Sequence, residues 1–307
     1  MNEILVVGSL NIDLVSYVSH FPRSGETIKS DSFSINTGGK GANQAVMSSR
    51  LGARVSMVGS VGDDSYGEKL LNELKKEKIN TDHIKTEGQT GLAFITVNNK
   101  GENKIILVPG ANDNLNESDI NNINEKINSV DLIIMQLEIP LKVIEQVLVL
   151  AKEKSKKVIL NPAPAKKLPL DILKNVDTLI PNESELHLLT NMPVNTFDEI
   201  KLASKHLIDL GVKQVITTMG ENGSYYTNGL NEIFLEAKKV EVVDTTGAGD
   251  SYVAAFSVGI VEGMDYMEAM KFANSIASVV VTNKGAIKSL PHVNKVNSIK
   301  NKIIGEK

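Results

Sequence analysis

Residues 130–164 read VDLIIMQLEIPLKVIEQVLVLAKEKSKKVILNPAP. The apolar run at 130–138 and the run KVIL at 157–160 have the length and composition of buried strands. Between them Pro140 precedes apolar residues at 141, 144, 148 and 151, and lysines end the segment, which is typical of an amphipathic helix. Strands that alternate with helices in this way predict a largely parallel sheet whose two faces are both covered.

The same alternation continues along most of the chain. Further buried strands are predicted at 3–10, 54–62, 178–182 and 214–220. Helices are predicted at 41–52, 66–79, 183–190 and 197–211, and two more after EVVDTTGAGD at 241–250. Apolar and polar residues instead alternate around turns at 13–37 and 92–108, which favours antiparallel strands in a small separate sheet, and 223–239 reads as another antiparallel pair. The prediction is an α/β fold built on a mostly parallel twisted sheet.

Composition and motifs exclude several classes of function. The net charge of −4 and the pI near 5.8 give no support to nucleic acid or an anionic membrane as a partner. The chain has no cysteine, which excludes disulfides and thiolate chemistry and fits a reducing cytoplasm. No segment reaches the roughly 18 apolar residues of a membrane span, and the amino terminus lacks the pattern of a signal peptide. We therefore expect a soluble, cytoplasmic protein.

Known nucleotide and metal motifs are also missing from the sequence. No Walker A motif is present, and Gly39-Lys-Gly-Ala-Asn-Gln lacks the third glycine of the dinucleotide fingerprint, which argues against a Rossmann-type dehydrogenase. The five histidines are scattered and none has metal-ligand spacing.

Polar residues gather where the predicted strands reach their carboxyl ends, and ligands of parallel sheets bind at that edge. These residues follow or flank the strands in chain order: Asn11 and Asp13, Gly38–Asn43, Gln136 and Glu138, Asn182, Thr218 and Gly220, and Asp244–Asp250 after the run EVV. Their shared location predicts that they converge on one cleft.

Several of these residues have a structural and a functional interpretation. The glycines of GGKGANQA suit either a flexible connection into a helix or a close approach of backbone to a ligand, with Lys40 and Asn43 as donors. Asn11 and Asp13 suit either a turn at a strand end or the binding of vicinal hydroxyls. Asn182 and Glu185 match a capping box, so a role near phosphate or Mg²⁺ needs further evidence.

The stretch DTTGAGDSY at 244–252 carries the most specific chemistry. Gly247, Ala248 and Gly249 leave backbone N–H groups bare at a helix start, and such a nest binds phosphate. Asp250 is stabilised as an anion at that position. Phosphoryl transfer depends mainly on positioning and charge stabilisation, so the amides at 247–249 are predicted to hold the transferred group while Asp250 accepts a proton.

Seven motifs in order resemble those of the sugar-kinase superfamily that includes ribokinase, fructokinase and adenosine kinase. They are GSLNID (8–13), GGKGANQAVMSSRLGA (38–53), TGLAFITVNNKGENKIILVPGAN (90–112), QLEIP (136–140), LNPAPA (160–165), PNESE (181–185) and DTTGAGDSYVAAF (244–256). The resemblance covers nearly the whole chain, and GGKGANQA, QLEIP and NPAPA are similar to the ribokinase branch in particular.

This resemblance implies a fold, an activity and partners. The fold would be a single ribokinase-like domain over 1–307, with a large three-layer α/β/α part and a small β-sheet lid inserted at about 11–38 and 91–108. The activity would be ATP-dependent phosphorylation of D-ribose at its 5-hydroxyl, with Mg²⁺ and a monovalent cation, usually K⁺. The lids would pair in a homodimer.

The resemblance also implies roles for individual residues. Asp250 would be the base, and Gly247, Ala248 and Gly249 the anion hole. The sugar would be bound by Asn11, Asp13, Gly39, Lys40, Gly41, Asn43, Glu138 and Asp250. ATP and Mg²⁺ would be held by Asn182, Glu185, Thr218, Met219, Gly220, Gly223, Gly249 and Asn274. The monovalent cation would be held by Asp244, Thr246, Val280, Asn283, Gly285 and Ser289.

Two alternatives stay open at this point. One is a kinase for another furanose, such as 2-deoxyribose or fructose, because the sequence does not define the shape of the sugar pocket. The other is a non-catalytic sugar-binding protein on the same fold, against which the intact GAGD segment argues, since a lost activity would leave Asp250 free to change.

Overall fold

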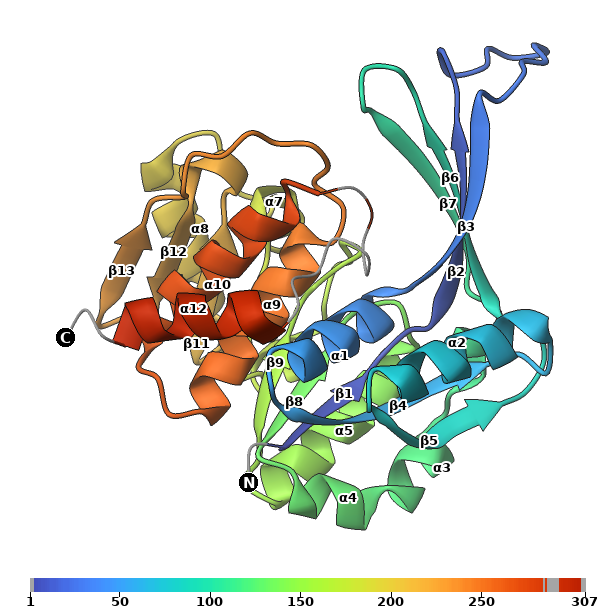
Figure 1. Ribbon diagram of the computed structural model, residues 1–307. Coiled ribbons are helices and arrows are strands. Elements are labelled where there is room, and N and C mark those ends of the chain that lie inside the picture. Colours follow the sequence, from blue (N-terminus) through green and yellow to red (C-terminus); the bar gives the residue numbers. More distant parts are fainter. Residues whose placement is uncertain (1–2, 284, 286–292, 305–307) are drawn as a thin grey trace.

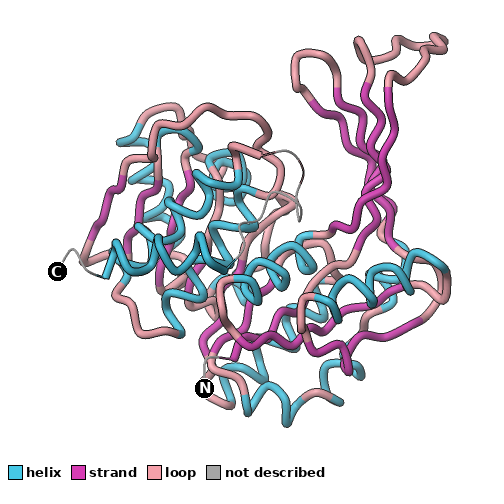
Figure 2. Tube along the Cα trace, in the orientation of Figure 1, coloured by secondary structure: helices cyan, strands magenta, loops and turns pink. Residues whose placement is uncertain are grey.

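The computed structural model describes residues 3–283, 285 and 293–304. A large sheet lies between two layers of helices, and a smaller sheet projects from this body (Figure 1). Figure 2 distinguishes the strands of the two sheets from the helices and from the segments that connect them. This arrangement confirms the predicted α/β/α fold class with a small additional sheet.

The large sheet is parallel except at one edge, where β11–β12 and β12–β13 pair in antiparallel fashion. Within the described residues its nine strands lie in this order: β13 (Glu232–Leu235), β12 (Ser224–Thr227), β11 (Gln214–Thr218), β10 (Thr178–Leu179), β9 (Lys157–Leu160), β8 (Leu132–Met135), β1 (Glu3–Val7), β4 (Arg54–Val61) and β5 (Asn80–Thr86).

The helices divide between the two faces of this sheet. One layer contains α1 (Lys40–Arg50), α2 (Ser65–Lys76), α9 (Ala248–Val261), α10 (Tyr266–Val280) and α12 (Val293–Ile304). The other contains α3 (Glu117–Asn122), α4 (Asn124–Ser129), α5 (Leu141–Glu153), α6 (Leu170–Leu173), α7 (Glu183–Thr190) and α8 (Phe197–Asp209). Short 3₁₀ turns lie at Gly110–Asn114 and Gly220–Asn222.

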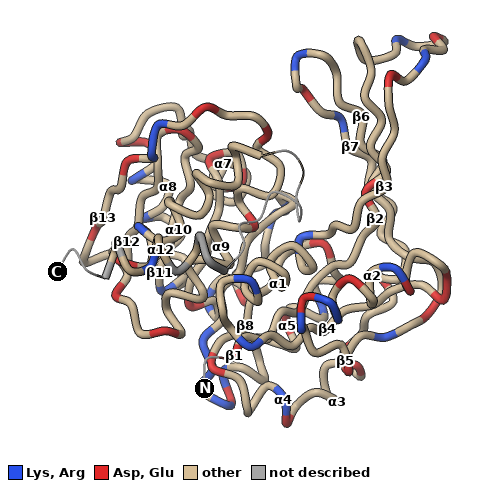
Figure 3. Tube along the Cα trace, viewed as in Figure 1, with Lys and Arg blue, Asp and Glu red and all other residues tan. Residues whose placement is uncertain are grey.

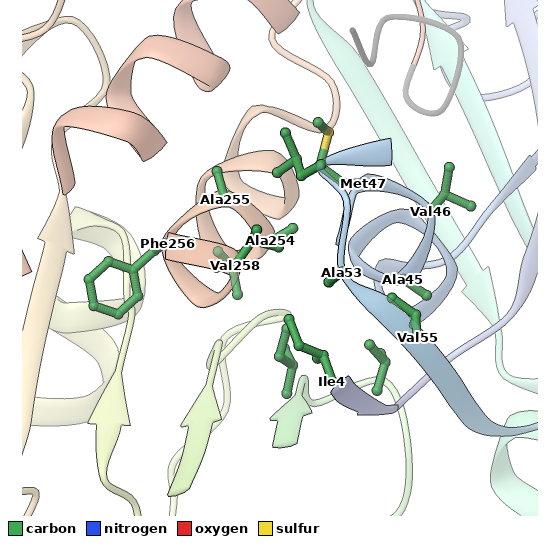
Figure 4. Close-up of a cluster of buried hydrophobic side chains, with 14 of the residues drawn as sticks. Ile4, Ala45, Val46, Met47, Ala53, Val55, Ala254, Ala255, Phe256 and Val258 are labelled. Carbon is green, nitrogen blue, oxygen red and sulfur yellow. The ribbon is translucent and has the colours of Figure 1, made fainter. Parts of the chain in front are cut away.

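The alternation of side chains along β1 produces two cores. Ile4 and Val6 point into the core beneath α1 and α9, whereas Leu5 and Val7 point into the core beneath α5. Figure 4 shows the first core, where Ile4 lies below side chains from α1, β4 and α9. Small residues such as Ala254 let α9 lie close to the sheet, which fixes the position of its amino terminus.

The projecting sheet consists of β2 (Asn11–Tyr17), β3 (Ser32–Gly38), β6 (Gly91–Val97) and β7 (Asn103–Val108). Its strand order is β3-β2-β6-β7. The sheet is mixed, because the central pair β2–β6 is parallel while the outer pairs are antiparallel. The purely antiparallel pattern expected from the sequence was therefore wrong for that pair.

Three further features differ from the sequence prediction. The run EVV at 241–243 forms no strand, and Val242 and Val243 are exposed because no neighbouring strand pairs with them. The half-polar segment Asn80–Thr86 is an edge strand, β5. Short helices occupy 110–129, and α12 follows α10. These elements lack a clear apolar period or fall at the end of the chain.

Charged residues of both signs are spread over the body, whereas the middle of the projecting sheet is largely uncharged (Figure 3). In the described part of the chain, no helix is long and apolar enough to cross a membrane.

Candidate active site

A cavity of about 210 Å³ opens at the carboxyl ends of β9, β10 and β11. Its walls come from segments far apart in the sequence, including the starts of α1, α7 and α9. Seven residues predicted from the sequence line it: Lys40, Asn182, Glu185, Thr218, Gly247, Gly249 and Asp250.

The amino terminus of α9 forms one wall. Gly247 caps the helix with φ +79°, a left-handed conformation that favours glycine, and no side chain caps the helix. The N–H of Ala248 donates to the carbonyl of Thr245 at 3.1 Å. The N–H groups of Gly247 and Gly249 meet no acceptor among the described residues, and no atom lies within 4 Å of a Cβ built on Gly249. Two amides of the predicted anion hole are therefore open, while that of Ala248 is engaged.

The carboxylate of Asp250 lies at the base of this wall, with 7% of the residue exposed. Oδ2 accepts a hydrogen bond from Nδ2 of Asn43 at 2.8 Å, and Oδ1 accepts one from Nε2 of Gln44 at 3.0 Å. Oδ1 of Asn43 is buried and has no hydrogen-bond partner in the described structure, so it can accept a hydrogen bond from a hydroxyl group of a ligand.

Among the described residues that line the cavity, Lys40 is the single cation, and it lies among four carboxylates. Burial by itself would lower the pKa of Lys40, but Asp250, Glu138, Glu185 and Asp13 together raise it. Lys40 therefore stays protonated, and its ammonium group offsets part of the negative charge in the cavity.

Among the four carboxylates around Lys40, Asp13 has the most strongly shifted pKa. Burial, followed by the charges of Glu138 and Asp250, raises the pKa of Asp13 from 3.8 to about 7, although Lys40 opposes this shift. Gly38 pairs with Asn11 across β2–β3 and is therefore diagonal to Asp13, and a Cβ at Gly38 would lie 2.3 Å from Oδ2 of Asp13. The glycine makes room for the carboxylate.

This raised pKa predicts how stability changes with pH. The folded protein keeps a proton on Asp13 that the unfolded chain releases above pH 4, so the free energy of unfolding should fall as pH rises from about 4 to 7. This decrease in the free energy of unfolding is on the order of 4 kcal/mol at most. Urea unfolding at pH 4.5 and 7.5 should show a smaller difference for Asp13→Asn than for wild type. The exposed control Asp63→Asn should match wild type, and an unchanged difference in Asp13→Asn would contradict the assignment.

Ser9, Asn11 and Glu138 form a polar cluster at the start of the projecting sheet. Oε2 of Glu138 accepts from Oγ of Ser9 at 2.5 Å, from Nδ2 of Asn11 at 3.4 Å and from the N–H of Lys40 at 3.2 Å. The cluster links the end of β8 to the first turn of α1.

Gly39 and Gly41 pack the start of α1 against this cluster. Gly39 has φ +90°, and a Cβ there would lie 2.7 Å from the N of Asn11. A Cβ at Gly41 would lie 2.6 Å from backbone atoms of Gly8 and Ser9. Both glycines are thus required for close packing, and their predicted contact with a sugar stays a prediction.

The capping box at α7 is present, and it also faces the cavity. Oδ1 of Asn182 accepts from the N–H of Glu185, and Oε2 of Glu185 accepts from the N–H of Asn182, both at 2.8 Å. Burial, partly offset by the Asn182 N–H and Lys40, raises the pKa of Glu185. The box uses one carboxylate oxygen of Glu185, which leaves the other for a ligand.

The remaining predicted nucleotide residues lie beyond this cavity. Gly220 is open to solvent, while a Cβ at Gly223 would lie 2.0 Å from the carbonyl oxygen of Leu235. Met219 is buried, and Asn274 accepts a hydrogen bond from Ser224 at 3.3 Å. A second cavity of about 380 Å³ lies between α10, α12 and the segment that contains Val240.

The predicted cation residues are partly brought together. Oδ1 of Asp244 accepts from the N–H of Thr246 at 2.9 Å, and Oδ2 accepts from the N–H of Gly285 at 2.8 Å. The carbonyl of Val280 accepts the N–H of Asn283 at 3.0 Å. Ser289 lies outside the described residues. No cluster of three or more His, Cys, Asp or Glu side chains suited to a metal occurs in the described ranges.

Sequence reasoning missed four polar residues that support the site. Gln44 and Asn161 are buried beside Asp250, Ser9 binds Glu138, and Asn112 donates to Oδ1 of Asn11 at 2.8 Å. Gln44 was detectable as a polar residue inside the predicted helix next to Asn43, and Asn161 as the residue that follows KVIL.

Comparisons with known proteins agree on one family. The model described as pfkB family carbohydrate kinase matches residues 1–293. A ribokinase of Schizosaccharomyces pombe is 40% identical over 309 residues, with 97% of each chain covered. A deoxyribokinase of Salmonella typhimurium is 38% identical over 298 residues, with 96% of this chain and 97% of the relative covered. The structure of Arabidopsis thaliana ribokinase with ribose and ATP has a TM-score of 0.90 and 34% identity, with 97% and 98% covered. With its cavity, its helix amino terminus and its buried aspartate, this chain belongs to the pfkB family of carbohydrate kinases.

Proposed function

We propose that this protein transfers the terminal phosphoryl group of ATP to the 5-hydroxyl of D-ribose. The observation that carries the proposal is the position of Asp250, whose buried carboxylate faces a cavity beside the open amides of Gly247 and Gly249. A proton acceptor next to an anion-binding helix terminus is the arrangement that phosphoryl transfer needs.

In this mechanism Asp250 accepts the proton of the sugar hydroxyl as the oxygen attacks the terminal phosphorus. The bond from that phosphorus to the bridging oxygen breaks, and ADP leaves. The open amides of α9 and the ammonium of Lys40 offset the charge on the transferred group.

The sugar side is supported by Asp13 and Glu138, whose charges act on Lys40, and by Asn11 and Asn43, which donate hydrogen bonds to Glu138 and Asp250. The unpartnered Oδ1 of Asn43 suits a sugar hydroxyl in particular. We propose that the projecting sheet acts as a lid over this sugar, since Asn11 and Asp13 belong to its strand β2.

The nucleotide side is supported by Asn182, Glu185, Thr218 and the glycines of α9. The free oxygen of Glu185 fits the hydration shell of a Mg²⁺ ion, which neutralises phosphate charge when it is bound. The second cavity, lined by Val240, Val279 and Ile299 among others, suits the purine ring of ATP.

A kinase for 2-deoxyribose is the second candidate, because a deoxyribokinase is as similar to this chain as some ribokinases. The test is ADP release from ATP and Mg²⁺ with ribose, 2-deoxyribose, fructose or adenosine as the acceptor. Ribose should give the highest kcat/KM, because a site built to bond a hydroxyl rejects an analogue without it. A higher kcat/KM for 2-deoxyribose would establish the second candidate, and no release with any acceptor would refute both.

We also propose a monovalent-cation site beside Asp244, Thr246 and Gly285. The carboxylate of Asp244 accepts hydrogen bonds from the N–H groups of Thr246 and Gly285, which brings these predicted cation residues together. Replacing K⁺ by tetramethylammonium should lower kcat several-fold, because the ion orders the loop that precedes the α9 amides. Equal initial rates in both salts at matched ionic strength would contradict this site.

The projecting sheet is proposed to pair with a second copy of the chain. Ile35, Phe94 and Ile106 lie in one row across its strands and are 39%, 45% and 69% exposed. Sedimentation velocity should show a dimer, and Ile106→Glu should shift it to monomer. Leu230→Glu, at a 92% exposed position outside the sheet, should leave the dimer intact. A wild type that stays monomeric at every concentration would refute the pairing.

A further inference from the structure

Three buried amide side chains form a hydrogen-bonded chain behind Asp250. Nε2 of Gln136 donates to Oε1 of Gln44 at 2.6 Å. Nε2 of Gln44 donates to Oδ1 of Asp250 at 3.0 Å and to Oδ1 of Asn161 at 3.3 Å. Gln44 and Gln136 are fully buried, and Asn161 is 7% exposed.

Gln136 and Asn161, the two neighbours of Gln44 in this hydrogen-bonded series, determine which way the amide of Gln44 points. Nδ2 of Asn161 donates to the carbonyl of Ile180 at 3.0 Å, so its Oδ1 must face Gln44 and needs a donor there. Gln136 supplies a donor on the opposite side of Gln44. Both neighbours therefore favour the orientation in which Nε2 of Gln44 faces Asp250, and the reversed amide would place an oxygen against the carboxylate.

The backbone makes room for this arrangement. A Cβ on Gly8 would lie 2.0 Å from Oε1 of Gln136, so the residue that follows β1 must be a glycine if Gln136 is to reach Gln44. Oε1 of Gln136 itself has no hydrogen-bond partner within the described residues. An unpaired buried oxygen is unfavourable, so the hydrogen bond that Nε2 of Gln136 donates to Gln44 is what favours this orientation of the Gln136 amide.

We propose that Gln44 is a positioning residue for phosphoryl transfer, oriented by Gln136 and Asn161, which holds the carboxylate of Asp250 toward the acceptor hydroxyl. This inference rests on the proposed role of Asp250 as the base. Gln44 and Asn43 each donate to one carboxylate oxygen, so the side chain is fixed at both oxygens by neutral groups. A neutral donor orients the base and adds no positive charge to that of Lys40, and further positive charge would make the base a weaker proton acceptor.

Kinetics of Gln44→Met tests this role, because methionine keeps the length of the side chain and removes the donor. We expect kcat to fall roughly ten- to hundredfold, with little change in the KM for sugar. Gln136→Leu, which removes the donor that orients Gln44, should lower kcat in the same direction by a smaller factor. Ser257→Ala, which removes a buried hydroxyl bonded within α9, should match wild type.

The pH profile separates positioning from a merely structural effect. Loss of a hydrogen bond to a carboxylate favours its protonated form, so the acid limb of kcat/KM should move to higher pH in Gln44→Met. The charged groups that face Asp250, namely Lys40, Asp13 and Glu185, are present in every variant. An acid limb and a kcat identical to those of wild type would overturn the proposal.

A thermal double-mutant cycle measures the contact without any turnover. Gln44→Glu places two carboxylates against each other and should lower Tm at pH 8. Adding Asp250→Asn supplies a new donor and should raise Tm again by about 5 °C relative to Gln44→Glu alone. Additive changes in Tm would overturn the contact. If wild type phosphorylates no acceptor, the proposed function fails and positioning for catalysis fails with it, while a coupled cycle still establishes that Gln44 holds Asp250.

Discussion

Asp250→Asn should lower kcat by about a thousandfold while the affinity for sugar stays within a few-fold of wild type. The substitution removes the proton acceptor but keeps the size of a side chain that Asn43 and Gln44 contact directly. Initial-rate measurements give kcat, and isothermal titration with the sugar acceptor gives the affinity.

Asp265→Asn is the matched control for this prediction. Asp265 caps the next helix, α10, and an asparagine caps a helix equally well, so kcat should not change. If Asp250→Asn keeps the turnover of wild type, Asp250 is not the base. If it loses sugar binding as well, the carboxylate acts mainly in binding.

Lys40→Met should have the second largest effect, and it should act on both catalysis and stability. Removing the ammonium group takes away charge stabilisation in the cavity, for which we expect a loss in kcat of about a hundredfold. Asp13, Glu138, Glu185 and Asp250 would then face one another without the cation that lies among them.

The stability effect has a definite sign. Without Lys40, the pKa values of Asp13 and Glu185 should rise further, because the ammonium lowers both. A raised carboxyl pKa in the folded state makes stability fall as pH rises, so the unfolding free energy of Lys40→Met should decrease more steeply than that of wild type between pH 5 and 8. Urea unfolding across this range measures the slope.

Lys69→Met is the control for both measurements. Lys69 is exposed on α2 and donates to the carbonyl of Ile35, away from the cavity carboxylates. Its variant should keep the kcat and the pH slope of wild type. A Lys40→Met protein with the same slope as wild type would show that the ammonium does not offset the carboxylates.

The sequence determined the elements whose signal is local. The apolar period of Leu141–Glu153 and the buried runs of β1, β8 and β9 are properties of neighbouring residues, and the structure confirms them. The capping box of Asn182 and Glu185 was likewise readable from a spacing of three residues. Where the signal was mixed, as in the edge strand β5, or misleading, as in the exposed run EVV, the sequence alone was insufficient.

Only the tertiary structure decided how the polar residues meet. Asn43 and Gln44 lie 207 and 206 residues before Asp250 in the chain, and no local pattern connects them. Their contact depends on the packing of α1 beside α9, which small side chains such as Ala45 and Ala254 permit. The same packing places Lys40 among four carboxylates, so the titration of Asp13 follows from distances across the folded core. Residue types thus gave the chemistry that the site contains, whereas close packing between distant segments gave each group its partner.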